Sequence, residues 1–145
     1  MSLLNGVRVL DLSTVIAAPF AAGLMADFGA DVIKVEQPEG GDPFRALGPY
    51  HKGEPMRWAA MGRNKRCITL DLRKAKGKEL CLELIKQCDV VIENFRTGTL
   101  DKWGLSYEAM KQANPNIIVT RVTGYGQTGP NAMVAGFGTP ATSAQ

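Results

Sequence analysis

The first 36 residues constrain the fold most strongly, because they read as a strand, a helix and a second strand in close succession. Residues 7–12 and 31–36 are rich in Val, Leu and Ile and carry the alternation typical of β-strands. Between them, Pro19 suits the first turn of a helix and Gly29 suits the position after its end, which predicts a helix over residues 19–28. Such a unit gives two parallel strands joined by a right-handed crossover.

The same alternation resumes after one long interruption. Prolines and glycines break every regular pattern over residues 37–62, so we expect a long irregular connection there, of the kind that is usually functional or mobile. Beyond it, the pattern predicts strands over 67–72, 89–93 and 116–122, a helix over 77–88, and short helices over 100–103 and 107–113. This order predicts an α/β fold with a Rossmann-like, open, mainly parallel sheet that has helices on both faces.

The last part of the chain differs from the rest. Residues 122–145 contain five glycines, two prolines and no charged residue, and they show no helical or strand periodicity. We therefore expect residues 1–121 to form the Rossmann-like unit and residues 122–145 to be a glycine-rich segment leading into further protein. On this interpretation the chain is the first part of a longer one.

Composition excludes several classes of function. A net charge of +3 is too small to suggest a nucleic-acid partner. No apolar run approaches the roughly 20 residues of a membrane span, and the N-terminus lacks the basic and apolar parts of a secretion signal. Three cysteines without a CxxC pair and a single histidine, His51, do not make a metal site. We expect a cytoplasmic protein with no metal, no nucleic acid and no membrane among its partners.

Positive charge is concentrated in residues 63–66 and 73–78. Two interpretations stay open at this point. The residues are solvated side chains around a helix start, or they form a small electropositive site for a phosphorylated ligand.

Two turns follow predicted strands, where open parallel sheets bind their ligands. The first, after residue 12, lacks the GxGxxG glycines that let a backbone approach a pyrophosphate, so NAD binding there is disfavoured. It is either a ligand-binding turn or a packed apolar one. The second contains Asn94, Phe95 and Arg96, which could cap the turn, stack on a ring and contact a phosphate, or could form a plain Asx-turn.

One set of segments stands out for its order along the chain: residues 6–13 (GVRVLDLS), 18–20 (APF), 29–36 (GADVIKVE), 41–43 (GDP), 64–66 (NKR), 70–72 (LDL), 93–96 (ENFR), 114–115 (NP) and 124–130 (GYGQTGP). Together they resemble the N-terminal part of the family III CoA-transferases, a group that includes formyl-CoA transferase, carnitine CoA-transferases and the α-methylacyl-CoA racemases. The resemblance spans essentially the whole chain, and it covers only the first part of the longer family members.

The resemblance implies that coenzyme A, or an acyl-CoA, binds as a substrate and not as a tightly held cofactor. It places CoA across the carboxyl ends of the strands. The positions that match the family's CoA contacts are Val15, Ile16, Ala17, Gln37, Leu70, Arg73, Asn94, Phe95, Arg96 and Lys102. One departure is Gln37, where formyl-CoA transferase has an arginine; Lys34, Arg63 or Arg73 could replace that phosphate contact.

The resemblance also implies a covalent mechanism, in which an aspartate carboxylate exchanges CoA between an acyl-CoA and a small carboxylic acid through an aspartyl-CoA thioester. None of the seven aspartates of this chain matches that nucleophile, so we expect no catalytic residue in it. The racemase branch uses a histidine that matches Phe137, and a phenyl ring cannot move a proton. The transferase branch is therefore favoured, with a non-catalytic CoA- or nucleotide-binding fragment as the alternative. Family members form homodimers, which we expect of the full-length protein.

Overall fold

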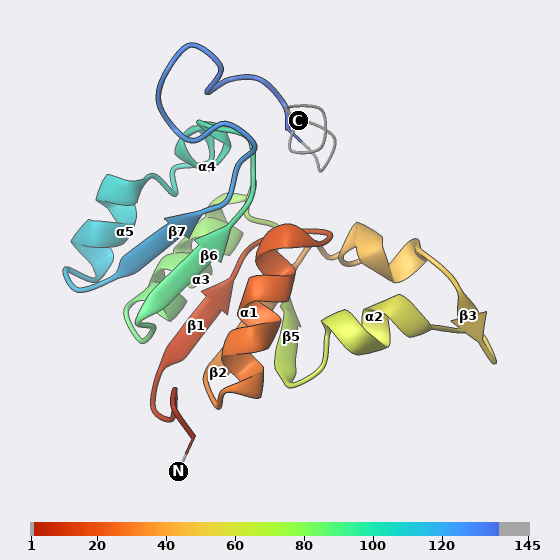
Figure 1. Ribbon diagram of the computed structural model, residues 1–145. Coiled ribbons are helices and arrows are strands. Elements are labelled where there is room, and N and C mark those ends of the chain that lie inside the picture. Colours follow the sequence, from red (N-terminus) through yellow and green to blue (C-terminus); the bar gives the residue numbers. More distant parts are fainter. Residues whose placement is uncertain (1, 137–145) are drawn as a thin grey trace.

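A single parallel sheet organises the structure, a computed structural model that describes residues 2–136. Its five strands are β1 (Arg8–Asp11), β2 (Asp31–Glu36), β5 (Lys65–Thr69), β6 (Val90–Glu93) and β7 (Ile118–Arg121). They lie in the order β5-β2-β1-β6-β7, and every neighbouring pair is parallel (Figure 1). The chain thus builds outward from β1 in one direction and then reverses to the other side, which is the Rossmann arrangement and confirms the predicted fold class.

Helices cover both faces of the sheet. On one face, Val9 and Val32 pack against α1 (Ala17–Asp27), whose inner side is made of alanines that let the helix lie close. On the other face, Leu10, Ile33 and Val91 pack against α3 (Ala75–Ile85) and α5 (Tyr107–Ala113), beside the short α4 (Thr99–Lys102). Successive residues of each strand therefore alternate between two separate cores, as the strand period requires.

The predicted helix and strand bounds are correct to within about two residues at most ends, the usual scatter of such boundaries. The largest shifts are of three residues: β5 ends at Thr69 and not at residue 72, and α3 ends at Ile85 and not at residue 88. β5 also begins at Lys65 and not at residue 67. Lys65 joins the strand because its side chain is fully buried and its ammonium lies 3.0 Å from the Asp11 carboxylate. A residue that sequence alone assigns to a solvated loop is thus part of the sheet.

The prediction of an irregular connection over residues 37–62 is wrong. The segment contains a 3₁₀ helix η1 (Pro43–Ala46), a hairpin of β3 (Tyr50–His51) and β4 (Glu54–Pro55), and α2 (Met56–Met61). Its prolines and glycines lie at the ends of these elements and in the turns between them. Pro43 begins η1, and Gly53, at φ 86°, completes the hairpin turn.

Arg45 holds the segment of residues 37–62 against the sheet. Its guanidinium donates two hydrogen bonds, of 2.7 and 2.8 Å, to the carboxylate of Glu36 at the end of β2. The same guanidinium lies 3.9 Å above the ring of Trp58 in α2, within range of a cation–π interaction. Residues 37–62 are therefore held by an ion pair to Glu36, near their start, and by the contact of Arg45 with Trp58 in α2.

The remaining described segment, residues 122–136, consists of turns and bends. The predicted division after residue 121 stays a prediction. Within residues 2–136, no helix is long and apolar enough to cross a bilayer. In that same range, no three His, Cys, Asp or Glu side chains gather closely enough to hold a metal ion.

Candidate functional site

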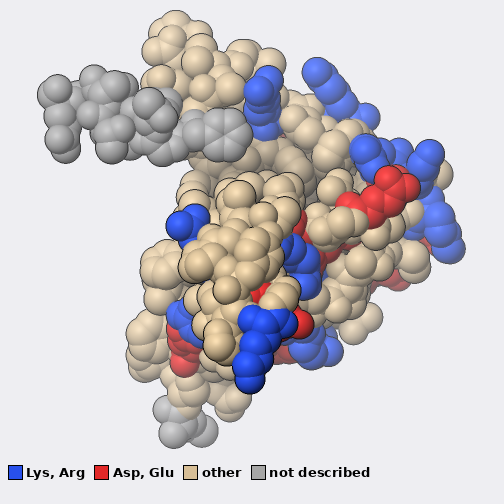
Figure 2. All heavy atoms as spheres, turned by 90° about the vertical axis from the view of Figure 1, so that its right-hand side faces the viewer, with Lys and Arg blue, Asp and Glu red and all other residues tan. Residues whose placement is uncertain are grey.

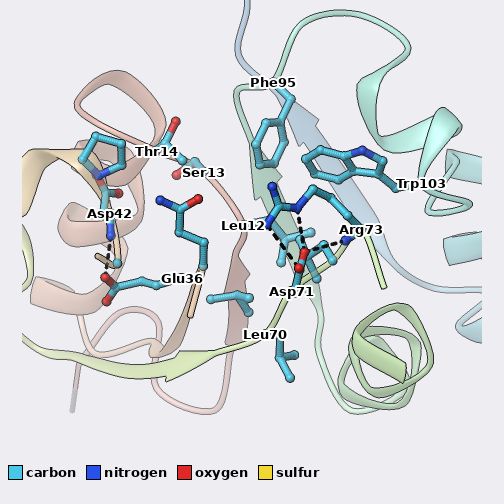
Figure 3. Close-up of a pocket in the computed structure, with 15 residues that line it drawn as sticks. Leu12, Ser13, Thr14, Glu36, Asp42, Leu70, Asp71, Arg73, Phe95 and Trp103 are labelled. Carbon is cyan, nitrogen blue, oxygen red and sulfur yellow. Dashed lines mark hydrogen bonds and ion pairs between the residues drawn. The ribbon is translucent and has the colours of Figure 1, made fainter. Parts of the chain in front are cut away.

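A cavity of about 180 Å³ opens at the carboxyl ends of the strands, where the chain reverses its direction of travel between β1 and β6 (Figure 3). Ser13 and Thr14 from the turn after β1 line one side, together with Asp42. Phe95 and Trp103 line the opposite side. This reversal point is where open α/β sheets bind their ligands.

The far side of the cavity carries an aromatic pair. Phe95 follows β6 and Trp103 follows α4, and their ring centres lie 5.2 Å apart with an interplanar angle of 71°. An edge-to-face pair of this kind is a stable arrangement of two rings and offers a rigid apolar surface. Leu12, Leu70 and Leu72 line the cavity as well, so its surface suits a flat ring or an apolar chain.

One arginine stands at the cavity with its charge accessible. Arg73 donates two hydrogen bonds to Asp71, one from Nε at 2.7 Å and one from Nη2 at 3.1 Å, and its side chain is 60% exposed. These hydrogen bonds hold the pKa of Asp71 below its ordinary value. Because Nη1 and much of the guanidinium stay open to solvent, Arg73 can still donate to an incoming anion.

The turn after β1 is fixed by three side chains that accept its backbone N–H groups. Ser13 N–H donates to Asp11 Oδ1 (3.1 Å), Thr14 N–H to Asn94 Oδ1 (2.8 Å) and Val15 N–H to Asp42 Oδ1 (3.1 Å). Asn94 completes the contact by donating from Nδ2 to the Thr14 carbonyl oxygen at 2.8 Å. Three consecutive N–H groups are thus directed at protein oxygens.

Val15 adopts a backbone conformation that its side chain disfavours. Its φ is 67°, in the left-handed region, which costs a β-branched residue about 1–2 kcal/mol. Such a conformation persists only where the surroundings hold it. Here the carboxylate of Asp42 accepts the Val15 N–H through both oxygens, at 3.1 and 3.3 Å.

A buried ion network lies directly behind this turn. The Lys34 ammonium is fully buried, 3.2 Å from Asp42 Oδ2 and 3.8 Å from Asp11 Oδ1, and it also donates to the Ser13 carbonyl oxygen. Lys65 pairs with the other oxygen of Asp11 at 3.0 Å. Two ammonium groups and two carboxylates balance one another, as buried charges must. Burial lowers the pKa of Lys65, and Asp11 opposes that effect.

Glu36 and Glu93 show opposite pKa shifts at the ends of two strands. Burial alone would raise the pKa of Glu36, but hydrogen bonds from Arg45 and from the Asp42 N–H outweigh it and hold the value below its ordinary range. Burial raises the pKa of Glu93, despite a hydrogen bond from the Phe95 N–H and the nearby Arg121. Both carboxylates are committed to holding the segments that follow their strands.

The ten predicted CoA contacts divide into three groups. Gln37, Leu70, Arg73 and Phe95 line the cavity. Asn94 and Val15 belong to the adjoining turn, where their polar groups already contact protein. The remaining four, which do not line the cavity and are exposed, are Ile16, Ala17, Arg96 and Lys102. Contact with CoA stays a prediction for all ten.

The two basic segments do not form one electropositive site. Residues 63–66 surround the start of β5, at the amino ends of the strands, where Arg63 pairs with Asp27 and Arg66 with Asp31. Only residues 73–78 lie at the carboxyl ends. Figure 2 agrees, since its basic side chains form separate groups, most of them beside acidic ones. Of the three residues suggested to replace an arginine at Gln37, Arg73 alone lines the cavity with it.

Sequence reasoning missed Trp103 and Asp42 as residues of this cavity. Trp103 directly follows the predicted contact Lys102, and the structure turns its ring toward Phe95. Asp42 lies in the segment 41–43 that carries part of the resemblance, which was the available signal. Phe137, on which the choice between the transferase and racemase branches rests, lies outside the described residues.

Comparisons with known proteins agree with this fold and identify the family. A family described as "CoA-transferase family III" matches residues 4–145. The chain is 52% identical over 135 residues to the "Succinyl-CoA--L-malate CoA-transferase beta subunit" of Chloroflexus aurantiacus, covering 92% of this chain and 33% of that protein. It is 44% identical over 135 residues to the human "Succinyl-CoA:glutarate CoA-transferase", covering 92% and 31%.

Solved structures show the same relationship. A "CAIB/BAIF family protein from Brucella suis" superimposes with a TM-score of 0.92 at 42% identity, covering 99% of this chain and 39% of that one. A "putative betaketoacyl-ACP reductase", at 14% identity and a TM-score of 0.51, shares the fold alone. The chain spans about a third of the length of the curated relatives it matches. With the match extending over nearly all of its residues, the chain belongs to CoA-transferase family III.

Proposed function

We propose that this chain forms the CoA-binding part of an acyl-CoA:carboxylate CoA-transferase, which moves CoA between an acyl-CoA and a small carboxylic acid. The observation that carries the proposal is the cavity at the reversal point of a family III sheet, with Arg73 at its edge and Phe95 and Trp103 on one side. The names of the relatives favour succinyl-CoA as the donor and an acid such as malate, citramalate or glutarate as the acceptor.

The cavity offers complementary groups for such a substrate. CoA carries phosphates, an adenine ring and an uncharged pantetheine arm. Arg73 supplies a charge-assisted hydrogen bond to a phosphate, and the aromatic pair supplies a surface for a ring or an aliphatic chain. CoA is released and rebound in each turnover, so it acts as a substrate.

The proposed chemistry needs a carboxylate nucleophile. Its attack on the acyl-CoA carbonyl breaks the thioester and gives a mixed anhydride and CoA thiolate; the thiolate then attacks the aspartyl carbonyl and releases the free acid. Five of the seven aspartates of this chain are already engaged by cationic side chains and are unsuited to that role. Asp11 and Asp42 are buried in ion pairs, and Asp27, Asp31 and Asp71 are held by arginines. We place the nucleophile in a part of the protein beyond these residues.

The alternative is a CoA-binding module without chemistry of its own, and the engaged aspartates favour it for the chain by itself. Incubation of the full-length protein with succinyl-CoA and glutarate separates the two, because only a transferase exchanges CoA. For this chain by itself we expect no exchange and no acyl-enzyme trapped by hydroxylamine. A robust rate would identify an aspartate of this chain as the nucleophile.

Calorimetric titration with CoA, dephospho-CoA and NAD tests the binding function. We expect the chain to bind CoA more tightly than NAD. Arg73→Ala should weaken CoA binding by roughly 1–3 kcal/mol, the scale of a charged hydrogen bond. Arg66→Ala is the matched control, because Arg66 is also exposed and paired with an aspartate but lies at the amino ends of the strands. Equal or tighter binding of NAD would refute the proposal.

We also propose that the full-length protein is a homodimer. Ile16, Phe20, Leu24 and Phe28 recur every four residues along α1, and each is 40–53% exposed. An apolar stripe of this kind usually marks a contact surface. Light scattering of the full-length protein should give twice the mass of one chain, and a monodisperse monomer would contradict the assignment.

A further inference from the structure

Three consecutive N–H groups in the turn after β1, those of Ser13, Thr14 and Val15, are not available to a ligand phosphate. In dinucleotide-binding proteins of this fold, N–H groups at this position receive the pyrophosphate. Here those of Ser13, Thr14 and Val15 donate to Asp11, Asn94 and Asp42. The carbonyl oxygens of Ser13 and Thr14 are occupied as well, by Lys34 and Asn94.

Asp42 is the member of this arrangement that comes from outside the strands. It reaches the turn from the loop after β2, and only 2% of it is exposed. One of its oxygens accepts from Val15 N–H at 3.1 Å and from Phe44 N–H at 2.8 Å, and the other lies 3.2 Å from the Lys34 ammonium. Asp42 thereby joins η1, β2 and the turn.

The Lys34 ammonium makes this position of Asp42 possible. The Lys34 ammonium donates to the Ser13 carbonyl oxygen, and two carboxylates face it, Asp42 Oδ2 at 3.2 Å and Asp11 Oδ1 at 3.8 Å. A buried carboxylate without such a partner would be strongly unfavourable. The pair lets a charged acceptor sit beneath a strained residue, Val15, away from water.

We propose that Asp42 is a positioning residue for the substrate. It holds Val15 in the left-handed conformation, and so fixes the wall that Ser13 and Thr14 present to the cavity. Because Ser13 and Thr14 have no free N–H group, this wall accepts the uncharged pantetheine arm of CoA and gives the CoA phosphates no backbone donor. The inference rests on the proposed function, since it concerns how the same cavity holds the same substrate.

The test compares two double variants that differ only in the acceptor. Lys34→Met removes the ammonium, so that neither variant leaves an unpaired buried charge. In that background, Asp42→Asn keeps a side-chain oxygen for the Val15 N–H, and Asp42→Ala removes it. Glu54→Ala, which removes an exposed acid in the β3–β4 hairpin, is the control in the wild-type chain. Two quantities are measured: hydrogen exchange of the Val15 amide by NMR, and the affinities for CoA and for 3′,5′-ADP, which lacks the pantetheine arm.

We expect the Asp42→Ala double variant to lose protection of the Val15 amide and to bind CoA about tenfold more weakly or worse, the range for losing a charged hydrogen bond. Its affinity for 3′,5′-ADP should match that of the Asp42→Asn double variant, which should stay close to wild type in both measurements. Glu54→Ala should change neither quantity.

Three results would overturn the inference: equal behaviour of the two double variants, an equal loss for both ligands, or unfolding confined to the Asp42→Ala chain, which would make Asp42 purely structural. A wild-type chain that binds no CoA would instead refute the proposed function. Val15 amide exchange in the two double variants would then still decide whether Asp42 holds the turn.

Discussion

Gly77→Ala should destabilise the protein, although it adds a strong helix former to the interior of α3. A Cβ at Gly77 would overlap the backbone carbonyl oxygen of Asp71 and lie 2.7 Å from its carbonyl carbon. Ordinary carbon contacts lie at roughly 3.5–4.0 Å, so α3 has to move away by on the order of 1 Å. The atoms it meets are backbone, so no side-chain rotation relieves the overlap.

The magnitude follows from two opposing effects. Overpacking against a rigid neighbour costs about 3 kcal/mol, the upper part of the usual range. Replacing a helical glycine by alanine increases the free energy of unfolding by about 1 kcal/mol. The net loss is therefore about 2 kcal/mol, which should lower the melting temperature by about 6–8 °C in a chain of this size. Displacement of Asp71 should also move Leu70 and Arg73 at the cavity, and so weaken CoA binding.

Gly23→Ala is the matched control, because Gly23 is also a buried glycine inside a helix, α1. A Cβ there would meet the Lys65 side chain at 3.8 Å and the Met61 carbonyl oxygen at 3.9 Å, which are ordinary contacts. Gly23→Ala should stabilise the protein by about 0.5–1 kcal/mol. Thermal melts followed by circular dichroism measure both variants. A Gly77→Ala protein as stable as wild type would refute the reasoning, because α3 would then not touch the 71–74 segment as the structure has it.

Two further predictions concern ionisable groups. Arg45→Ala should destabilise the protein by about 1–2 kcal/mol at pH 7, and the difference from wild type should shrink as the pH falls to 3. The reason is that the pKa of the Glu36 carboxyl is lower in the folded protein than in the unfolded chain. Such a group stabilises the folded state above its unfolded pKa of about 4.3, and this contribution is lost as the pH falls through the folded pKa. Urea titrations at both pH values measure the difference in stability, and a difference that stays constant would contradict the prediction. Thiol titration with a disulfide reagent at pH 8 should modify Cys67 first, since it is exposed, whereas burial raises the pKa of Cys81 to about 12 and of Cys88 to about 11. Those two should react only after denaturant is added, and prompt reaction of all three would show that the core opens readily.

Local periodicity was sufficient to predict the sheet and its helices. The runs at 7–12 and 31–36 were recognisable as β1 and β2 because they are rich in Val, Leu and Ile in a strand-like alternation, and most of their residues are buried. β5 was misplaced because the pattern counts Lys65 as polar, whereas its burial depends on Asp11, which lies 54 positions away. No short window of sequence contains that pairing.

The candidate site was predictable only in part, for a similar reason. Residues that follow strands directly, such as Phe95, could be found because the carboxyl ends of parallel strands converge. Asp42 and Trp103 lie farther from their strands, in η1's cap and after α4, and their positions depend on how those short elements pack. The elements within 37–62 were missed because Arg45 fixes them through Glu36 and Trp58, which are tertiary contacts.

The buried ion network also sets an order of events in folding. Its contacts join residues 21, 27 and 54 positions apart, so they require β1, β2, β5 and the loop before η1 to meet. A lysine cannot shed its water until its carboxylates are in place, because the desolvation of an unpaired ammonium is too unfavourable. The apolar face formed by Leu10, Ile33 and Val91 contains no charged group, so it can pack before any ion pair has formed. That face should therefore form first, and the sheet should close over Lys34 last, so that substitutions of Lys34 accelerate unfolding and leave the rate of folding almost unchanged.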